Sequence, residues 1–497
     1  MHIGASSVSM LMTDLSSGSP QPMEFLEQPL PCARDIFSTG KVKQSTTERA
    51  VEILLGYLDS LNELGAGPKQ LTRVVATNIL NEAANRDVVM NRLTIGTGLP
   101  IEILDDGEMT RLVYMKTQRR LQEIPALQKK QTLVVHVGPG NTRALLFNKG
   151  KILFYASYRL GTHRTAEAID GSLAEGEAEL RLIRENASGP ISRIIHDLRG
   201  HQVDELVLIG YEIQLMAPFL LKSGKRSFSL RTLKSLCREA AEMPEDQRPV
   251  SYQIDFNAAE ALLPALEINA AIAEELGLKA ANLATSDYER GLLYDLPATA
   301  QLTRDFEAEV IRSAQALADK FQTHTVHGKQ VAYLAGRLFE ETRSLHKLNE
   351  KDALLLQVAA ILHECGGFVS PHMHHKHSQY LILHSEVFGL SLSERTVVAL
   401  VARYHRMSPP KPLHEPYANL GHDVQIRVNK LAAILRVADA LERTHSARVR
   451  DLSAQIGRNK LRLKLEGISD ATAERLALQG KADLFQDIFG LEVVIQE

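Results

Sequence analysis

The chain has 497 residues, and its formal net charge is only −3. A single hydrophobic core rarely grows this large, so we expect several domains. Apolar residues make up 44% and charged residues 24% of the chain, which excludes long disordered segments. The nearly balanced charge provides no general attraction for nucleic acid or an acidic membrane, and we therefore predict no specific nucleic-acid partner.

The cysteines and the apolar segments favour a cytoplasmic protein. Cys32, Cys237 and Cys365 are far apart and form no C-x-x-C pair, which argues against a disulfide framework and a thiolate zinc site. The longest apolar stretch, around residues 353–362, is too short to cross a bilayer. The N-terminus lacks the pattern of a signal peptide. We expect no association with a membrane.

The N-terminal half alternates strand and helix patterns. Residues 2–12 and 133–147 each combine a strand, a glycine-bearing turn and a second strand, which indicates two copies of one unit. A third strand ends on Gly210, as expected where the backbone approaches a ligand closely. Helical patterns lie between these strands, at residues 48–64, 78–92 and 109–121. The half is predicted as α/β, with the three glycine turns around one phosphate cleft.

The C-terminal part is predicted to be mainly helical. From about residue 302 amphipathic helices follow one another, and strand patterns nearly vanish until residue 460. Residues 460–465 and 491–496 alternate like strands and flank a helical pattern at 471–487, which predicts a small β-α-β segment. The expected domains are two α/β lobes, a helical domain and a small cap, at residues 1–121, 122–300, 301–455 and 456–497.

Four N-terminal segments carry glycines or small polar residues in a characteristic order. They are His2-Ile-Gly-Ala-Ser-Ser7, Ala76-Thr-Asn-Ile-Leu-Asn-Glu-Ala-Ala-Asn85, Asp105-Asp-Gly-Glu-Met-Thr-Arg111 and His136-Val-Gly-Pro-Gly-Asn-Thr-Arg143. Together they resemble the Ppx/GppA family of exopolyphosphatases and guanosine-pentaphosphate phosphohydrolases. The resemblance implies two ribonuclease-H-like lobes of the actin/hexokinase/Hsp70 type, a polyphosphate or phosphorylated nucleotide as ligand, and a homodimer. For any one glycine alone, the alternative is a simple turn between strands.

The same resemblance assigns residues to an N-terminal site. It implies Glu108 as the catalytic acid, although only this member of the family's pair of acids remains and Met109 follows it. Further family acids are replaced by His2, His136 and Arg143, which do not position a metal or activate water as carboxylates do. We therefore predict weak or absent hydrolysis at this site. The implied phosphate-binding residues are Gly4, Ser6, Ser7, Gly138, Gly140, Asn141, Thr142 and Gly210.

Histidines are concentrated between residues 363 and 422. A set of histidines and acids around this region resembles the ligand order of HD hydrolases and the C-terminal domain of the Ppx/GppA family. It implies an HD-type domain that holds a divalent metal, Mg, Mn, Fe or Zn, with Glu364 also catalytic. The alternative is that these histidines cap helices or make buried hydrogen bonds. The implied ligands are His327, His363, Glu364, His377, His405 and Asp439. Four other histidines are assigned to loops or the surface, namely His372, His374, His375 and His384.

Three functions remain open from the sequence. The first is a phosphohydrolase of phosphoanhydrides, such as polyphosphate or guanosine pentaphosphate, with an impaired N-terminal site. The second is a metal-dependent HD-domain hydrolase of a nucleotide or phosphoester. The third is a regulator that binds polyphosphate or an alarmone without turnover. Metal content separates the first two, and ligand binding without hydrolysis identifies the third.

Overall fold

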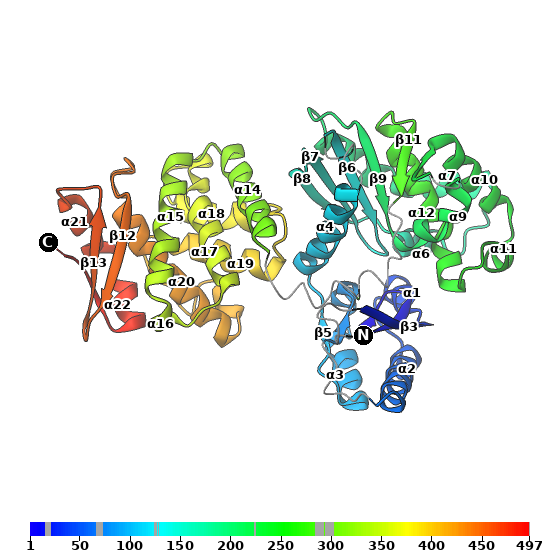
Figure 1. Ribbon diagram of the computed structural model, residues 1–497, viewed down its shortest axis with the longest axis horizontal. Coiled ribbons are helices and arrows are strands. Elements are labelled where there is room, and N and C mark those ends of the chain that lie inside the picture. Colours follow the sequence, from blue (N-terminus) through cyan, green and yellow to red (C-terminus); the bar gives the residue numbers. More distant parts are fainter. Residues whose placement is uncertain are drawn as a thin grey trace. The chain divides into compact units, whose positions relative to one another are not determined.

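The computed structural model describes residues 1–14, 21–65, 73–123, 127, 129–222, 225–283, 293 and 303–496. The chain divides into two compact units, Met1–Gln301 and Leu302–Glu497 (Figure 1). As the sequence predicts, the first unit is α/β and the second is mainly helical. Among the described residues, no helix is both long enough and apolar enough to span a membrane.

The N-terminal unit begins with a five-stranded sheet. Its strands are β1 (His2–Ile3), β2 (Ser7–Asp14), β3 (Gln21–Pro29), β4 (Val75–Ala76) and β5 (Glu102–Ile103), in the spatial order β3-β2-β1-β4-β5. The helices around it are α1 (Cys32–Thr39), α2 (Gln44–Glu63), the 3-10 helix η2 (Asn78–Glu82), α3 (Arg86–Thr97) and α4 (Asp106–Glu123). Helix α2 buries Ile53, Tyr57 and Leu61, because residues three to four apart share one face of a helix.

A six-stranded sheet follows in the same unit. Its strands are β6 (Gln131–Val137), β7 (Thr142–Asn148), β8 (Lys151–Tyr158), β9 (Glu205–Ile209), β10 (Ser227–Ser229) and β11 (Ala280–Leu283), in the order β10-β11-β9-β6-β7-β8. The helices are α6 (Thr162–Ile169), α7 (Glu177–Asp197), α8 (Tyr211–Leu215), α9 (Ala217–Leu220), α10 (Leu230–Glu242), η3 (Glu245–Gln247), α11 (Arg248–Tyr252) and α12 (Phe256–Glu275). Each sheet packs its own hydrophobic core.

The two sheets contain the same local unit. In the first, β1 pairs antiparallel with β2 across a glycine turn and parallel with β4 on its other side. In the second, β6 pairs antiparallel with β7 and parallel with β9 in the same way. The duplication predicted from residues 2–12 and 133–147 is therefore present. It brings corresponding turns to the carboxyl ends of parallel strands, where ligands bind in many α/β proteins.

The C-terminal unit starts with a helical bundle. Its helices are α14 (Arg304–Lys320), α15 (Thr325–Glu341), α16 (Arg343–His346), α17 (Glu350–Leu362), η5 (Cys365–Phe368), α18 (His374–Leu383), α19 (Leu392–Arg403), η6 (Tyr417–Asn419) and α20 (His422–Leu441). Helix α17 begins with a capping box between Asn349 and Asp352, which satisfies backbone N–H groups of its first turn. Helices α17 and α20 are buried along most of their length, and both pack against α15 and α19.

A small sheet with two helices ends the chain. Its elements are β12 (Asp451–Ile456), β13 (Lys460–Glu466), α21 (Thr472–Lys481), α22 (Asp483–Phe489) and β14 (Glu492–Ile495), with strand order β12-β13-β14. β13 pairs antiparallel with β12 and parallel with β14. Strand β12 was not predicted from the sequence, because its exposed and buried residues do not alternate regularly enough to give a clear strand pattern.

Candidate functional site

A pocket lies between the two lobes of the N-terminal unit, at the glycine turns. In each turn the glycine N–H donates to the carbonyl three residues later, from Gly4 to Ser7 at 2.7 Å and from Gly138 to Asn141 at 3.0 Å. The pocket encloses about 60 Å³, which is room for a few water molecules but not for a nucleotide. Its lining residues are His2, Ala5, Ser6, Ser7, Thr77, Asn78, Ile79, Glu82, Met109, His136, Gly138, Pro139, Gly140, Asn141, Arg143, Tyr211 and Glu212.

The two histidines that replace family acids occupy equivalent places in the two turns. A Cβ atom on Gly4 would lie 3.3 Å from Cε1 of His2, and one on Gly138 would lie 3.1 Å from Cε1 of His136. Each imidazole therefore folds over the glycine two residues further along the chain. Both rings are buried, and both line the pocket. The positions that carry acids in the family motif thus present imidazoles here.

Most of the predicted phosphate-binding residues lie at the pocket. Ser6, Ser7, Gly138, Gly140 and Asn141 line it, whereas Gly4, Thr142 and Gly210 stand outside its lining. The hydroxyl of Ser7 donates to Glu27 Oε1 at 2.7 Å, and the Thr142 hydroxyl donates to a backbone carbonyl. A Cβ atom on Gly210 would lie 2.7 Å from the Val137 carbonyl oxygen, so a larger residue would force the neighbouring strands apart. The two turns make the same backbone hydrogen bond, but the Ser7 and Thr142 hydroxyls already have partners.

Glu108 does not line this pocket. Its Oε1 accepts a hydrogen bond from Arg73 at 2.8 Å, and the next residue, Met109, contacts the pocket instead. One step along an α-helix rotates the side chain by about 100°. The side chains of Glu108 and Met109, which stand at the two positions of the family's acid pair, therefore point in different directions. Asp106 accepts from Asn78 at 2.6 Å and from Arg143 at 3.2 Å. The acids of the α4 segment are thus held by protein groups around the pocket.

Two carboxylates do line the pocket, and both have protein partners. Glu82 forms an ion pair across the lobes with Arg164 at 2.6 Å. Glu212 is fully buried and accepts a hydrogen bond from the Thr162 hydroxyl at 3.0 Å. His163 lies 3.7 Å from Glu212, and burial lowers the pKa of this histidine to about 4. Both carboxylates of the lining thus already have protein partners, and the imidazole beside Glu212 is neutral near pH 7.

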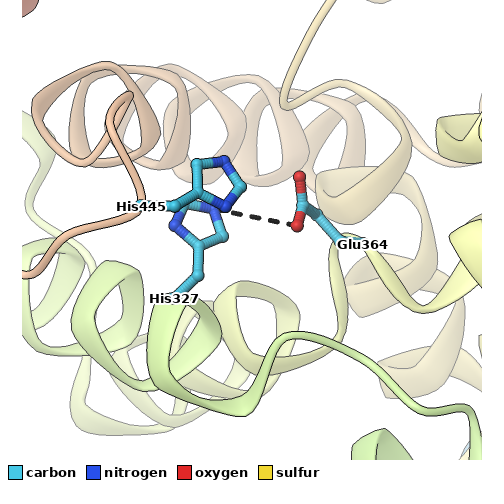
Figure 2. Close-up of side chains that lie close together, drawn as sticks. All are labelled: His327, Glu364 and His445. Atoms are coloured by element: carbon cyan, nitrogen blue, oxygen red, sulfur yellow. Dashed lines mark ion pairs between the residues drawn. The ribbon is translucent and has the colours of Figure 1, made fainter.

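A second candidate site is a buried cluster of histidines and acids in the C-terminal unit. His327 comes from α15, His363 ends α17, and Asp439 comes from α20. Asp439 Oδ1 lies 3.6 Å from His327 Nε2 and 3.8 Å from His363 Nε2. Glu364 Oε2 lies 3.9 Å from the same His327 nitrogen (Figure 2). In the described part of the chain, ligand atoms of His327, His363 and Asp439 all lie within 4.8 Å of one another, whereas Glu364 belongs to a second group that shares only His327 with the first.

Ring nitrogens of this cluster are available as metal ligands. His363 Nδ1 donates to the Ala360 carbonyl at 2.6 Å, so its Nε2 carries the lone pair that a metal ligand needs. Within the described residues, Nε2 of His363 and both ring nitrogens of His327 are buried and have no hydrogen-bond partner. Burial lowers the pKa of His363 and keeps its ring neutral. Unpartnered buried nitrogens beside a carboxylate fit a divalent metal.

The electrostatics of Asp439 fit the same role. Burial alone favours its neutral form, but the neighbouring His327 and the ammonium group of Lys481 hold the pKa of Asp439 well below its ordinary value. The carboxylate is therefore ionised. An ionised acid and neutral imidazoles are the ligand types that bind Zn, Fe and Mn.

Two histidines that the sequence analysis left outside the site join the cluster. His445, after α20, stacks on His327 with ring centroids 3.7 Å apart, and it forms a possible ligand group with His327 and Glu364 (Figure 2). His374 begins α18, and its Nε2 lies 3.3 Å from Nε2 of His405. The assignment of His374 to a loop or the surface is wrong, because the tight contact of Gly366 with α18 brings the start of this helix to the cluster.

The six predicted ligands differ in their positions. His327, His363, Glu364 and Asp439 belong to the ligand groups of the described residues, and the His405 ring lies 4.8 Å from that of His363. His377 belongs to neither ligand group in the described part of the chain. The residue of α18 that meets His405 is His374, one turn earlier. Nothing in the sequence distinguishes these two histidines, because only helix packing decides which one faces the cluster.

Comparison with known families matches both halves of the chain. The model of the Ppx/GppA phosphatase family matches residues 15–299, and that of Ppx/GppA phosphatase, domain III, matches residues 311–485. The first match alone covers more than half of the chain. The chain belongs to the Ppx/GppA phosphatase family. The match to Ppx/GppA domain III contains every residue of the histidine cluster, and the description of this part as an HD-type domain stays a prediction.

Named Ppx/GppA relatives are distant in sequence. A guanosine-5'-triphosphate,3'-diphosphate pyrophosphatase of Vibrio campbellii is 23% identical over 82% of this chain and 80% of its own length. A protein of the same name from Vibrio vulnificus is 23% identical over 88% of this chain and 86% of its own length. The crystal structure of an exopolyphosphatase from Cytophaga hutchinsonii, 16% identical, superimposes with a TM-score of 0.50 over 60% of this chain and 96% of that chain. The structural likeness concerns the fold alone.

Proposed function

We propose that this chain is a metal-dependent phosphohydrolase that cleaves phosphoanhydride bonds in polyphosphate or in a phosphorylated nucleotide such as guanosine pentaphosphate. The carrying observation is the convergence of unpartnered imidazole nitrogens on Asp439 in the C-terminal unit. The family supports a phosphate substrate. In the N-terminal pocket, by contrast, the carboxylates already have protein partners, which favours the C-terminal cluster as the hydrolytic site.

His327, His363 and Asp439 would hold the metal, with Glu364 and His445 adjacent to it. A divalent metal supplies a more acidic bound water and neutralises charge on the phosphate. The Glu364 side chain is 25% exposed and can exchange protons with solvent, so it is placed to accept a proton from the attacking water. His363 Nδ1, bonded to the Ala360 carbonyl, fixes the orientation of its ring.

A second function, phosphate binding without turnover, is favoured by the N-terminal pocket. Its glycine turns, Ser6 and Asn141 surround a cavity, whereas other acids of the family motif are replaced and the retained Glu108 lies outside the lining. The Glu82–Arg164 ion pair joins the two lobes at this cavity and would have to open for a nucleotide to enter. The pocket would then bind a phosphate chain and report it through lobe movement.

The decisive experiment separates the two sites in the purified full-length protein. Metal content is measured, and phosphate release is assayed from polyphosphate, guanosine pentaphosphate and a phosphodiester. We expect His363→Ala to abolish metal binding and hydrolysis, whereas His422→Ala, an exposed histidine at the start of the same helix that carries Asp439, changes neither. Hydrolysis that survives loss of the metal cluster and depends on the N-terminal pocket would refute this assignment.

We further propose that the helical unit is an HD-type domain and that the protein acts in the cytoplasm as a homodimer. The HD-type domain and the homodimer follow from the family resemblance, and the cytoplasmic location follows from the separated cysteines and the short apolar segments. The proposed domains are residues 1–121, 122–300, 301–455 and 456–497. Sedimentation of the purified protein tests the dimer, and limited proteolysis tests the domain limits.

A further inference from the structure

The terminal sheet segment, residues 451–495, places a lysine beside the histidine cluster. Lys481 is the last residue of α21, and its ammonium group contacts Oδ2 of Asp439. The other oxygen, Oδ1, is the one that faces His327 and His363. One carboxylate therefore presents one oxygen to the proposed metal ligands and the other to a cation from a segment 42 residues further along the chain.

A buried arginine holds this lysine in place. Arg436 lies one helical turn before Asp439 on α20 and is only 1% exposed. It donates to the Lys481 carbonyl at 2.8 Å and to Asp483 Oδ1 at 2.6 Å, which fixes the junction of α21 and α22 on α20. It also donates to the Met407 carbonyl at 3.0 Å, next to the His405 segment. A fully bonded buried guanidinium is a rigid support, so the position of Lys481 is set by the fold.

The chemistry of Lys481 fits a phosphate ligand. An ammonium group has three donors, and Asp439 uses only part of this capacity. The side chain is 19% exposed, so a solvent-borne ligand can reach it. A second cation, Arg406, lies 3.5 Å from His374 at the same cluster. The oxygens of a phosphoryl group are spaced much like those of a carboxylate. A phosphoryl group on the Oδ1 side of Asp439 can therefore also reach the ammonium group of Lys481 on the Oδ2 side.

We propose that Lys481 binds a phosphoryl group of the substrate and positions it at the metal cluster. This inference rests on the proposed function, because it requires a metal at His327, His363 and Asp439. It makes the terminal sheet segment part of the substrate site. The competing role is simple neutralisation of Asp439, which would leave phosphate binding unchanged when Lys481 is replaced.

The test measures binding of pyrophosphate to the manganese-loaded full-length protein by calorimetry, with metal content determined on the same samples. Lys481→Met removes the charge and the donors, and Lys481→Gln removes the charge but keeps a donor for Asp439. We expect both variants to retain the metal and to bind pyrophosphate at least about tenfold more weakly, since hydrogen bonds to charged groups contribute this much. Lys481→Arg restores most of the affinity. Lys460→Met, which removes a lysine paired with Glu492 in the same small sheet, has no effect.

The outcomes are distinguishable. If the wild-type protein holds no metal, both the proposed function and the role of Lys481 fail. If metal remains bound and pyrophosphate affinity is the same in the wild type and the two neutral variants, Lys481 is not a phosphate ligand, although the metal proposal stands. Tighter metal binding with unchanged pyrophosphate affinity overturns the role as well, and identifies Lys481 as a counter-ion of Asp439.

Discussion

The N-terminal pocket is built around backbone turns, whereas the C-terminal cluster is built from side chains of separate helices. The pocket keeps the backbone, with two equivalent glycine turns at the ends of β1 and β6, but imidazoles stand where the family motif has acids. In the cluster, histidine side chains from separate helices converge on Asp439. A backbone cradle alone can bind an anion, whereas hydrolysis requires groups that hold a metal and activate water. This difference is the reason for proposing the second region as the hydrolytic site.

The largest effect is expected from removal of the metal. A ligand that binds only the folded state stabilises it by about 4 kcal/mol at a free concentration a thousand times its dissociation constant. We expect added manganese, zinc or iron to raise the melting temperature of chelator-treated protein, and His363→Ala to abolish this shift. Scanning calorimetry of the full-length protein checks it. A shift that persists in His363→Ala would show that the metal binds elsewhere.

The sequence predicts the N-terminal turns better than the C-terminal cluster, for a physical reason. A hairpin such as β6–β7 is made by neighbouring residues, so strand patterns around Gly138 are sufficient to predict it. The order from His327 to Asp439 also marks most of the cluster. His374, His445 and Lys481 could not be identified, because helix packing and a buried arginine bring them to the site. The direction of Glu108 likewise depends on its ion pair with Arg73, which no local pattern reveals.

A smaller effect, on stability rather than chemistry, is expected at a buried imidazole that contacts two residues of the N-terminal pocket. His163 has its pKa lowered by burial to about 4, below the ordinary value of about 6.5. Between pH 6.5 and pH 4 the imidazole of His163 is protonated in the unfolded chain but neutral in the folded chain. The free energy of unfolding therefore falls as the pH falls through this range. Linkage gives a loss of about 2 kcal/mol between pH 7 and pH 5. Nearby Glu212 and the Ser6 hydroxyl, 3.0 Å from the ring, belong to the same network.

Thermal unfolding of the N-terminal unit at several pH values tests this prediction. His163→Gln is expected to show a weaker loss of stability between pH 7 and pH 5 than the wild type. His196→Gln provides the matched control, because this histidine of the same lobe has a side chain that is 67% exposed. Equal pH dependence in the wild type and His163→Gln would mean that His163 titrates normally.

Restoring acids to the pocket is expected to have a more modest effect. His136→Asp combined with Arg143→Glu puts back the two motif carboxylates, and we expect metal-dependent polyphosphate hydrolysis to rise about tenfold. The gain is limited because Arg143 now neutralises Asp106 at 3.2 Å, so its reversal creates neighbouring acids that need a metal between them. His136→Asn with Arg143→Gln, which changes the same positions without adding charge, should produce no gain. Equal activity of the two double variants would show that the lost acids do not limit this pocket.

The smallest effect is expected at Glu108, the acid that the family resemblance makes catalytic. Its carboxylate pairs with Arg73 at 2.8 Å, with both side chains less than one-fifth exposed, and Arg73 keeps a second partner in Glu102 at 3.1 Å. Glu108→Gln should therefore cost at most about 1 kcal/mol of stability and change phosphate release less than twofold. Met109→Glu, one residue further and in contact with the pocket, is the informative counterpart, because an acid there faces the glycine turns. A large loss of hydrolysis in Glu108→Gln alone would mean that this side chain leaves Arg73 and enters the pocket during the reaction. The assignment of hydrolysis to the C-terminal cluster alone would then be wrong, because the N-terminal pocket would still contain a working acid.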